Sequence, residues 1–360
     1  MHGFWWLPGH QEQRVPGVLS WDPNTGGALR LVGQLWPIVI QHNVLPDGHI
    51  QEHRDRTHDT DRSYPVVHGE ADNVAYTLLN TFQIRKRDWS LTQSSETVRV
   101  NSVLKGGFFG TPELHVGQAL FRLRDLAGWI GANGLELAYP DEPWVGDRFA
   151  TVSATRLPEF VVPSRGPSVA LEHRLEVSIN GNESVRINQD WVLCIDCGRL
   201  CPLQTLVDVA SDFQDLVTIA TERTAEFRSV ALHHPDLLEY SLDGRPLSGV
   251  HKSLTYYSRW ANRVDYVAEG VGSRKPMSGY EMCFTFEHLG VEGVGRWLDV
   301  AARFRTELRR AMTTRYARGY LEDKIMNLCA ALESFDKHHR GTTDNYVDRI
   351  TACVNLVLQG

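Results

Sequence analysis

The sequence lacks the features that would place it in a membrane or export it from the cell. Its apolar runs are all shorter than the roughly 20 residues that a membrane-spanning helix needs. The first residues, MHGFWWLPGHQEQ, carry neither the positively charged start nor the long apolar stretch of a secretory signal peptide. We therefore expect a cytoplasmic protein without a membrane partner.

Sequence motifs of several common enzyme classes are missing as well. There is no Gly-x-Ser-x-Gly elbow of a serine hydrolase and no His-Glu-x-x-His of a zinc protease. The glycine-rich stretch at residues 106–110 lacks the lysine and the following helix of a phosphate-binding loop. These absences exclude the corresponding enzyme classes, and we expect no cofactor.

What the chain does contain is typical of a folded globular protein. Its 360 residues are 42% hydrophobic and 22% charged, which provides apolar material for one large core or two ordinary cores. The net charge of −7 argues against a uniformly basic nucleic-acid coat. The distribution of charge matters more than its sum, because local patches bind local partners.

Most of the chain before residue 290 alternates apolar and polar residues with the period of β-strands, interrupted by glycine and proline. Asn180-Gly181 predicts a hairpin between residues 168–179 and 184–195, because both turn positions require positive φ. Apolar residues on one helical face predict a helix over residues 205–220. The alternation predicts further strands at residues 15–19, 28–33, 65–68, 75–84, 95–104, 119–123, 149–154, 226–232, 254–257 and 282–286.

From Gly293 the apolar period changes to 3.6 residues, which predicts helices, and two amphipathic segments follow at residues 320–335 and 345–358. The sequence therefore predicts an α+β fold. Residues 1–290 would form a large β-rich N-terminal domain of sandwich- or barrel-like antiparallel sheets with a few helices. Residues 291–318 would form a basic connecting helix, and residues 319–360 an α-helical domain that we expect to be incomplete.

An apolar stripe runs along the first amphipathic segment. Its spacings of four and three residues are those of one helix face, and its members are Leu321, Ile325, Leu328, Leu332 and Phe335. The second segment carries a comparable stripe. Two short helices cannot bury both stripes by themselves. We therefore expect a homodimer, in which a second copy covers them.

Short motifs follow one another along the chain in an order that resembles the ApeA family of bacterial anti-phage proteins. The motifs are GFWWLP at residues 3–8, PGVL at 16–19, LRLVG at 29–33, HG at 68–69, YTLL at 76–79, FFG at 108–110, a following Trp129, DLVTIA at 215–220, YLE at 320–322 and ALE at 331–333. The resemblance implies a β-rich, sensor-like N-terminal domain followed by a HEPN domain. HEPN domains are α-helical bundles, often dimeric, and many are metal-independent ribonucleases.

The resemblance also implies a function. It predicts abortive-infection defence, in which the β-rich domain senses a phage-derived trigger and the helical part cleaves or binds RNA, such as tRNA or another host RNA. A HEPN nuclease would carry an Arg–polar–(four to six residues)–His motif beyond Phe335, yet no histidine follows His339. The alternatives are therefore a truncated nuclease, a non-catalytic binding or sensor protein, and a zinc-binding β-domain protein.

Two sets of residues are candidates for the RNA chemistry. Glu333 lies at the edge of the apolar stripe, where it would be either an acid near a nuclease centre or the partner of an arginine such as Arg310. Seven arginines against two acids give residues 296–318 a local charge of about 7 − 2 = +5. This patch would bind RNA phosphates or pair with the acidic β-rich part, and we assign the RNA contacts to Arg309, Arg310, Arg315 and Arg318.

The cysteines and histidines leave further alternatives. Cys194, Cys197 and Cys201 include half of a zinc knuckle, but a second pair is lacking, so reduced thiols are the simpler interpretation. The polar loop at residues 46–63 carries three histidines that are either solvated or metal-binding, namely His49, His53 and His58. We predict no metal site.

Two other groupings have a structural and a functional interpretation. Trp5, Trp6 and Trp36 would either close one end of the β core or form a base-stacking surface. Arg228 and His233 match the spacing of a nuclease pair, but they lie in a predicted strand and before a proline, so we interpret them as an exposed arginine and a turn histidine.

Overall fold

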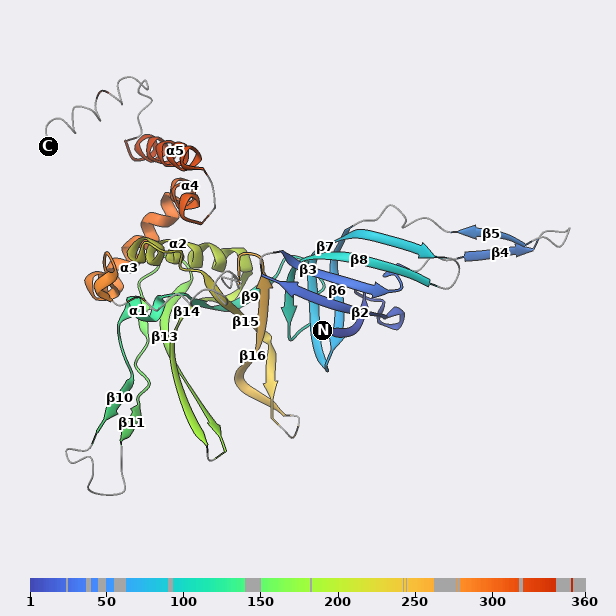
Figure 1. Cartoon of the computed structure of the whole chain (residues 1–360), viewed down its shortest axis with the longest axis horizontal. Coiled ribbons are helices and arrows are strands. Elements are labelled where there is room, and N and C mark those ends of the chain that lie inside the picture. The colour runs from blue at the N-terminus through green and yellow to red at the C-terminus, as the bar shows by residue number, and fades with distance from the viewer. Residues whose placement is uncertain are drawn as a thin grey trace.

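A computed structural model of the chain is shown in Figure 1. It describes residues 1–23, 25–36, 40–44, 50–54, 63–89, 93–139, 150–181, 183–241, 243, 245–261, 277, 279–316, 320–340 and 351.

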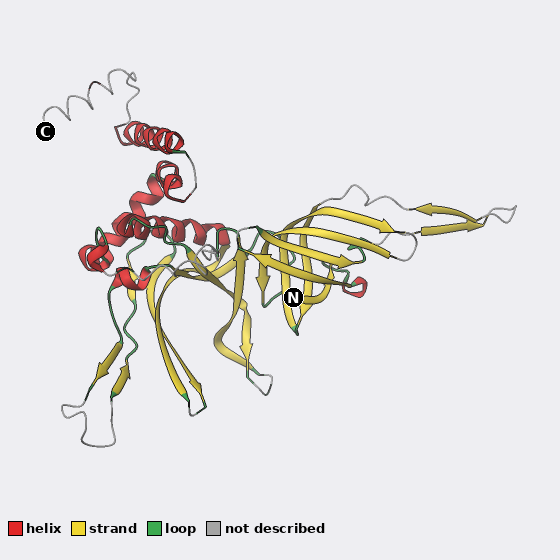
Figure 2. Cartoon of the chain, in the orientation of Figure 1, coloured by secondary structure: helices red, strands yellow, loops and turns green. Residues whose placement is uncertain are grey.

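Strands dominate the first 260 residues and helices the remainder (Figure 2). The strands are β1 (His2–Trp6), β2 (Val15–Asp22), β3 (Gly26–Val32), β4 (Ile40–Val44), β5 (Ile50–Arg54), β6 (Ser63–Ala71), β7 (Val74–Trp89), β8 (Gln93–Lys105), β9 (His115–Leu123), β10 (Leu135–Ala138), β11 (Thr151–Ala154), β12 (Phe160–Val162), β13 (Ser168–Asn180), β14 (Ser184–Pro202), β15 (Phe227–Tyr240) and β16 (Pro246–Ser258). The α-helices are α1 (Leu126–Ile130), α2 (Leu203–Thr221), α3 (Phe286–Arg303), α4 (Arg305–Tyr316) and α5 (Leu321–Arg340). The fold is thus a β-rich body followed by a C-terminal helical segment, as the sequence predicts.

Six strands near the N-terminus close into a barrel. They pair in the order β8-β3-β2-β1-β6-β7, and β7 pairs again with β8 to complete the ring. Inward-facing residues such as Trp5, Leu29 and Leu78 are fully buried in its interior. Closure removes the free edges that an open sheet would present. The barrel-like expectation is confirmed.

The N-terminal tryptophans belong to this core. A Cβ atom on Gly69 would lie 2.1 Å from the Trp5 ring, so the indole lies directly on the backbone of β6. Trp6 is 3% exposed and packs 5.6 Å from the ring of Phe108. Trp36 is partly buried against the same cluster. The base-stacking interpretation is therefore wrong for Trp5 and Trp6, because neither presents a free ring face to solvent.

The second half of the sheet is open and carries the helices. It continues from β8 in the order β16-β15-β9-β14-β13-β12. Helices α1, α2 and α3 cover one of its faces (Figure 1). Trp129 of α1, Phe213 of α2 and Phe286 of α3 meet edge to face in the shared core, with ring centroids 5.6–5.8 Å apart. Apolar packing thus unites this sheet with its three helices.

Local predictions mostly hold in this half. The turn at Gly181, with φ of +53°, joins β13 to β14, and Asn180 pairs with Ser184, which confirms the predicted hairpin. The helix predicted over residues 205–220 is α2. Its apolar face, which includes Leu206 and Leu216, is buried against the sheet.

The strand predicted at residues 282–286 is wrong. A short 3-10 turn (Gly279–Glu281) precedes α3, which begins at Phe286. The backbone N–H of Thr285 donates a 3.1 Å hydrogen bond to Nδ1 of His288, so a side chain fixes the helix start. The single helix predicted from Gly293 is also divided, because Phe304 leaves the helical conformation between α3 and α4.

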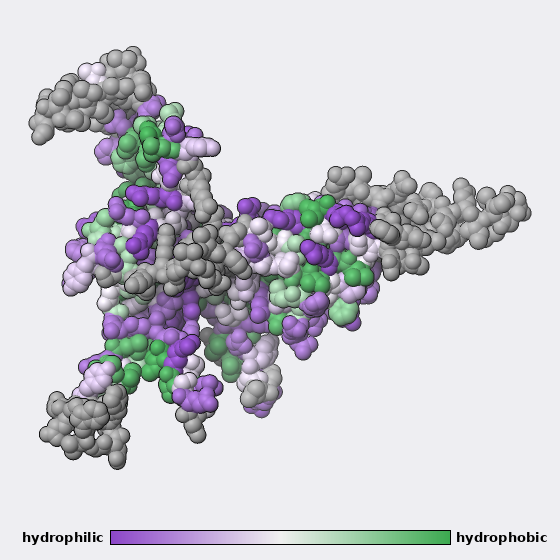
Figure 3. Space-filling model, viewed as in Figure 1, coloured by the Kyte–Doolittle hydropathy of each residue, from purple (hydrophilic) through white to green (hydrophobic). Residues whose placement is uncertain are grey.

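Helix α4 lies on the side of α2 away from the sheet, and α5 packs against α4 (Figure 1). The predicted helix over residues 320–335 is confirmed and extends to Arg340, whereas the segment at 345–358 lies outside the described residues apart from residue 351. Figure 3 shows apolar side chains gathered over α5. Leu321 and Leu332 are 69% and 68% exposed. None of the described helices has the length and apolarity to cross a membrane.

Candidate functional site

The face of α2 that points away from the sheet carries a row of acids. Asp208, Asp212 and Asp215 are spaced four and three residues apart, so they lie on one side of the helix. Asp212 and Asp215 are only 3% and 5% exposed. Buried carboxylates require hydrogen-bonding or charged partners, because water is not available to solvate them.

Helix α4 supplies the first two partners. Arg305 binds Asp212 in a fork, with Nη2 2.6 Å from Oδ2 and Nε 3.1 Å from Oδ1. Arg309, one turn later, places Nη2 2.6 Å from Oδ1 of Asp208. The arginines thus repeat the four-residue spacing of the acids that they bind. Two-point guanidinium–carboxylate contacts fix orientation as well as position.

The third partner is a phenol. The Tyr316 hydroxyl at the end of α4 donates to Oδ1 of Asp215 and lies 3.2 Å from Oγ1 of Thr218. Trp297 of α3 adds a bond from Nε1 to the backbone oxygen of Asp212, at 2.7 Å. These contacts tie the last turn of α4 and the middle of α3 to the same helix. We call the whole set the α2–α4 junction.

Burial sets the protonation of this junction. It raises the pKa of Asp215 to about 7, against the hydrogen bond from Tyr316. It also raises the pKa of Asp212, although Arg305 acts in the opposite direction. For Asp208, hydrogen bonds from Arg309 and Gln204 outweigh burial and lower the pKa. Asp215 therefore titrates near neutral pH, whereas Asp208 and Asp212 are each paired with an arginine.

A second polar contact joins α4 to α5. Glu307, 8% exposed, accepts a 3.0 Å hydrogen bond from Oγ of Ser334 and lies 3.5 Å from Nδ1 of His338. Phe304 packs beside it on Phe335, with ring centroids 4.6 Å apart. The pair α4–α5 is therefore a helical hairpin with its own small interface. It meets the body at α2 through the junction.

A comparison with known protein families bears directly on this architecture. The family model described as ApeA N-terminal domain 1 matches residues 1–268, which include both halves of the sheet and helix α2. The chain belongs to the ApeA family. The match links it to anti-phage defence. No curated protein and no solved structure matches the chain.

The ApeA domain therefore contributes the acids of the junction, and the helical segment contributes the arginines and the tyrosine. The motif DLVTIA at residues 215–220 begins with Asp215 and includes Thr218. Its apolar members Leu216 and Val217 are buried in the core. One short motif thus faces the sheet on one side and α4 on the other.

The structure separates the predicted RNA-contacting arginines. Arg309 is held by Asp208, which agrees with the predicted alternative of pairing with the acidic part of the chain. Arg310 and Arg315 are exposed on α4, and the backbone oxygen of Arg315 accepts a bond from Oγ1 of Thr224 at 3.3 Å. Arg318 lies outside the described residues.

Glu333 lies on α5, away from the ApeA domain. Its Oε1 is 3.0 Å from Nζ of Lys337, and the two side chains are 39% and 49% exposed. This is an i,i+4 ion pair on a helix surface. The acid that is buried between α4 and α5 is instead Glu307.

Sequence reasoning missed the junction as a unit. It found Arg309 but did not assign Arg305 or Tyr316, nor the acids that they bind. The indication was the four-residue spacing of Asp208 and Asp212, matched by that of Arg305 and Arg309. The partners are 93 and 101 residues apart in sequence, so spacing alone did not pair them.

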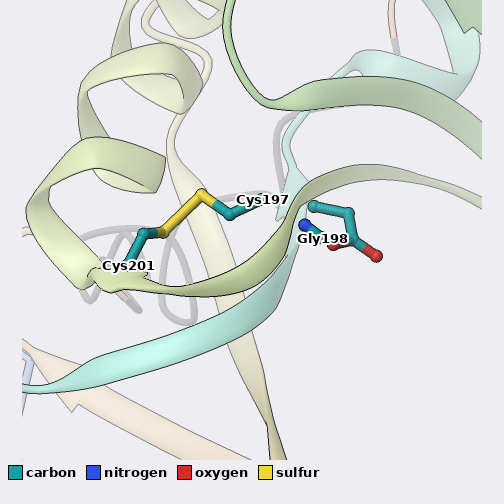
Figure 4. Close-up of a disulfide and its surroundings, with 4 residues drawn as sticks. Cys197, Gly198 and Cys201 are labelled. Atoms are coloured by element: carbon teal, nitrogen blue, oxygen red, sulfur yellow. Dashed lines mark hydrogen bonds between the residues drawn. A yellow bond between two sulfur atoms is a disulfide. The ribbon is translucent and has the colours of Figure 1, made fainter.

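The cysteines adopt neither of the arrangements considered from the sequence, which were reduced thiols and a zinc site. Cys197 and Cys201 form a disulfide, next to the first turn of α2 (Figure 4), which corrects the expectation of reduced thiols. Cys194 is free and buried, and burial raises the pKa of its thiol. A zinc site built on these three residues is therefore wrong, because two of the sulfurs bind each other. Within the described residues no group of three His, Cys, Asp or Glu side chains could hold a metal.

The remaining candidates lie apart. His49 and His58 are outside the described residues, and His53 is on β5 without a described side chain. Arg228 is exposed on β15. His233 is on the same strand, where its Nδ1 lies 2.7 Å from Oε1 of Gln118 rather than in a turn.

Proposed function

We propose that the chain is a cytoplasmic anti-phage defence protein of the abortive-infection type. In this proposal the ApeA domain senses a phage-derived or infection-linked trigger, and the helical segment contributes to a HEPN-type dimer that binds or cleaves RNA. Membership of the ApeA family over residues 1–268 is the observation that carries the proposal. The α2–α4 junction supplies a physical route between the two parts.

The route depends on the two faces of α2. One face packs in the core of the ApeA domain, and the opposite face holds Arg305, Arg309 and Tyr316. A trigger that shifts the sheet would move α2 and alter the distances between these charged groups. Because buried ion pairs lose stability steeply when one partner moves away, such a shift would favour release of α4. Release would also free Arg309 from Asp208.

The dimer would form on α5. Its exposed apolar stripe includes Ile325, Leu328 and Phe335, which are 50%, 42% and 38% exposed. Contiguous apolar surface of this kind is stabilised when another surface covers it. In light scattering the wild-type chain would be a dimer, and Leu332→Lys would be a monomer. Val300→Lys, an exposed position on α3, is the matched control and would leave the dimer intact. A monomeric wild-type chain at high concentration contradicts this part of the proposal.

The RNA contacts would come from Arg310, Arg315 and Arg318, joined by Arg309 when the junction opens, with Glu333 acting as an acid near the cleavage site. The measurement is the salt dependence of RNA binding. Each lost phosphate contact lowers the slope of log affinity against log salt by about 0.7 for single-stranded RNA. Arg310→Ala would show this decrease, and Arg186→Ala, at the distant tip of β14, would not. An unchanged slope for Arg310→Ala counts against the arginine patch.

A second candidate function is a non-catalytic sensor, favoured by the pairing of Arg309 with Asp208, which occupies one of the arginines otherwise assigned to RNA. The two functions separate in one assay, in which RNA is incubated with the chain in the absence of divalent metal. Cleavage that Glu333→Gln abolishes supports the nuclease. RNA binding without cleavage supports the sensor.

A further inference from the structure

A small pocket lies on the face of the open sheet that the helices leave uncovered. Its volume is about 230 Å³, and it is lined by residues from β9, β14, β15 and β16 and their connections. On these strands Ala119, Ile195 and Leu232 point into the helix-covered core, so their neighbours point into the pocket face. The polar side chains of the lining are Gln118, Asp196, Arg199, His233 and His251.

Three polar side chains in this lining form a directed chain of hydrogen bonds. Asp196 accepts from the backbone N–H of Gly198 at 2.6 Å and from Nε2 of Gln118 at 3.3 Å. The oxygen of the Gln118 amide is therefore an acceptor for His233, and Nδ1 of His233 must carry the proton of their 2.7 Å bond. The neutral imidazole thus keeps Nε2 as the nitrogen that can take up a proton.

The charged groups around His233 come from every neighbouring strand. Burial, then His251 and Arg174, lower its pKa, while Glu172 and Asp196 act in the opposite direction. Within the lining, the charges of Arg199 and Asp196 cancel. Protonation of His233 makes the lining net positive. A bound anion would therefore be accompanied by proton uptake.

The wall that carries Arg199 is a bulge in β14. Pairing of β14 with β9 shifts register between Asp196 and Cys201, and the Cys197–Cys201 disulfide bridges that interval. Gly198 adopts a φ of +64°, which glycine tolerates and which turns the chain sharply. The sulfurs pack toward the core, while Arg199 stays exposed. The bridge thus closes the bulge from behind and restricts the backbone that carries Arg199.

We propose that this pocket binds a small oxyanion of the phosphate type, such as the phosphate group of a phosphomonoester, and that the Cys197–Cys201 disulfide pre-organises the wall that carries Arg199. Guanidinium and imidazolium groups are the side chains best suited to phosphate oxygens. The volume accommodates one such group. This site is independent of the α2–α4 junction and of the RNA-binding proposal.

The test uses the full chain, with inorganic phosphate and phenyl phosphate as probes, titrated by calorimetry at pH 5.5 and pH 8. Because phosphate probes lose part of their own negative charge between pH 8 and pH 5.5, sulfate, whose charge is constant, is the probe for the pH dependence. Sulfate is expected to bind about tenfold tighter at pH 5.5, because the proton taken up at His233 adds a charged donor. Arg199→Gln and His233→Gln would each weaken binding about tenfold or more, as expected for loss of a charge-assisted contact. Arg186→Gln, an exposed arginine on the same strand, is the matched control and would bind like the wild type.

The disulfide is tested separately. A dithiol reductant transfers two electrons and two protons to the bridge, leaving two thiols while the reductant becomes a disulfide. Phosphate binding by the reduced chain, or by Cys201→Ser, would fall about three- to tenfold because pre-organisation is lost. Thermal unfolding identifies variants that fail to fold. The proposal is overturned if neither phosphate probe binds in the millimolar range, if the affinity for sulfate is independent of pH, or if Arg199→Gln binds as well as Arg186→Gln.

Discussion

Helices α3 and α4 are consecutive in the chain, yet they attach to the ApeA domain by opposite means. Helix α3 inserts Phe286, Val294 and Leu298 into the apolar core. Helix α4 meets the same body through Arg305 and Tyr316, against carboxylates of α2. Apolar packing responds little to pH, whereas buried charged pairs depend on the protonation of their partners.

The difference indicates where the molecule can change shape. Opening the α3 contact would expose a large apolar surface, which is costly under all conditions. Opening the α4 contact exchanges protein partners for water, and its cost depends on protonation. Four measurements test this contrast, beginning with the largest expected effect.

The apolar side of the comparison predicts a large loss of stability in Phe286→Ala. Phe286 lies between Trp129 and Phe160, with ring centroids 5.6 and 4.9 Å away. Removal of the ring would lower the free energy of unfolding by about 3–5 kcal/mol. Val300→Ala, on the exposed face of the same helix, would change it by less than about 0.5 kcal/mol. Urea unfolding followed by circular dichroism measures both, and equal losses in the two variants would contradict the assignment of α3 to the core.

The polar side predicts a pH dependence that Asp215→Asn removes. The carboxyl of Asp215 has a pKa of about 7 when folded, above its ordinary 3.8, so the folded state binds the proton more tightly. Its stabilising contribution is complete below about pH 4 and is lost as pH rises to about 7. The loss is on the order of 4 kcal/mol, since the pKa rises from 3.8 to about 7 and a change of one in pKa corresponds to about 1.4 kcal/mol.

The measurement is the free energy of unfolding from pH 4 to pH 8 in both chains. The difference between wild type and Asp215→Asn would decline over this range and level off above pH 7. A difference that stays flat, or that increases with pH, contradicts the conclusion that burial of Asp215 outweighs its hydrogen bond from Tyr316.

Arg305→Met would leave Asp212 buried without its guanidinium partner. We expect a loss of about 2 kcal/mol, smaller than full burial of a charge because Asp212 can take up a proton. The double variant Arg305→Met/Asp212→Leu would recover much of that loss, and Arg296→Met is the exposed control. Hydrogen exchange of the α4 amides reports the change directly. If exchange in α4 is unchanged, the junction does not hold this helix.

The smallest effect concerns Glu333 and Lys337 on α5. Because both side chains are well exposed, Glu333→Gln would lower stability by no more than about 0.5 kcal/mol. Lys337→Met would give the same small value. Loss of RNA cleavage in Glu333→Gln alone, with stability unchanged, would therefore report chemistry and not unfolding. A loss of several kcal/mol would show instead that Glu333 supports the helical hairpin.

Much of the fold could be predicted because its determinants are local. The turn between β13 and β14 uses the positive φ of Gly181, and α2 carries a continuous apolar face, so both elements follow from short windows of sequence. The stripe on α5 is equally visible. The start of α3 was not predictable in this way, since residues 282–286 alternate like a strand and the deciding contact is the side chain of His288.

The site was harder to predict because its partners are distant in sequence. Asp215 and Tyr316 are 101 residues apart, and nothing in either segment identifies the other. The disulfide was missed for a related reason, because the four-residue spacing of Cys197 and Cys201 is compatible with free thiols, a metal site or a bridge. The bulge that brings them together depends on how β14 pairs with β9.

Strand β8 has a consequence for the molecule as a whole. On one edge it pairs with β3 through residues 95–100 and with β16 through residues 102–105, while β7 occupies the other edge. The strand β8 thus belongs to both the barrel and the open sheet. A recombinant fragment that ends after β8 would leave the backbone amides and carbonyls of residues 102–105 without their β16 partners. Such an exposed strand edge can pair with another molecule. We therefore expect the barrel and the open sheet to fold as one unit, so that neither can be expressed without the other.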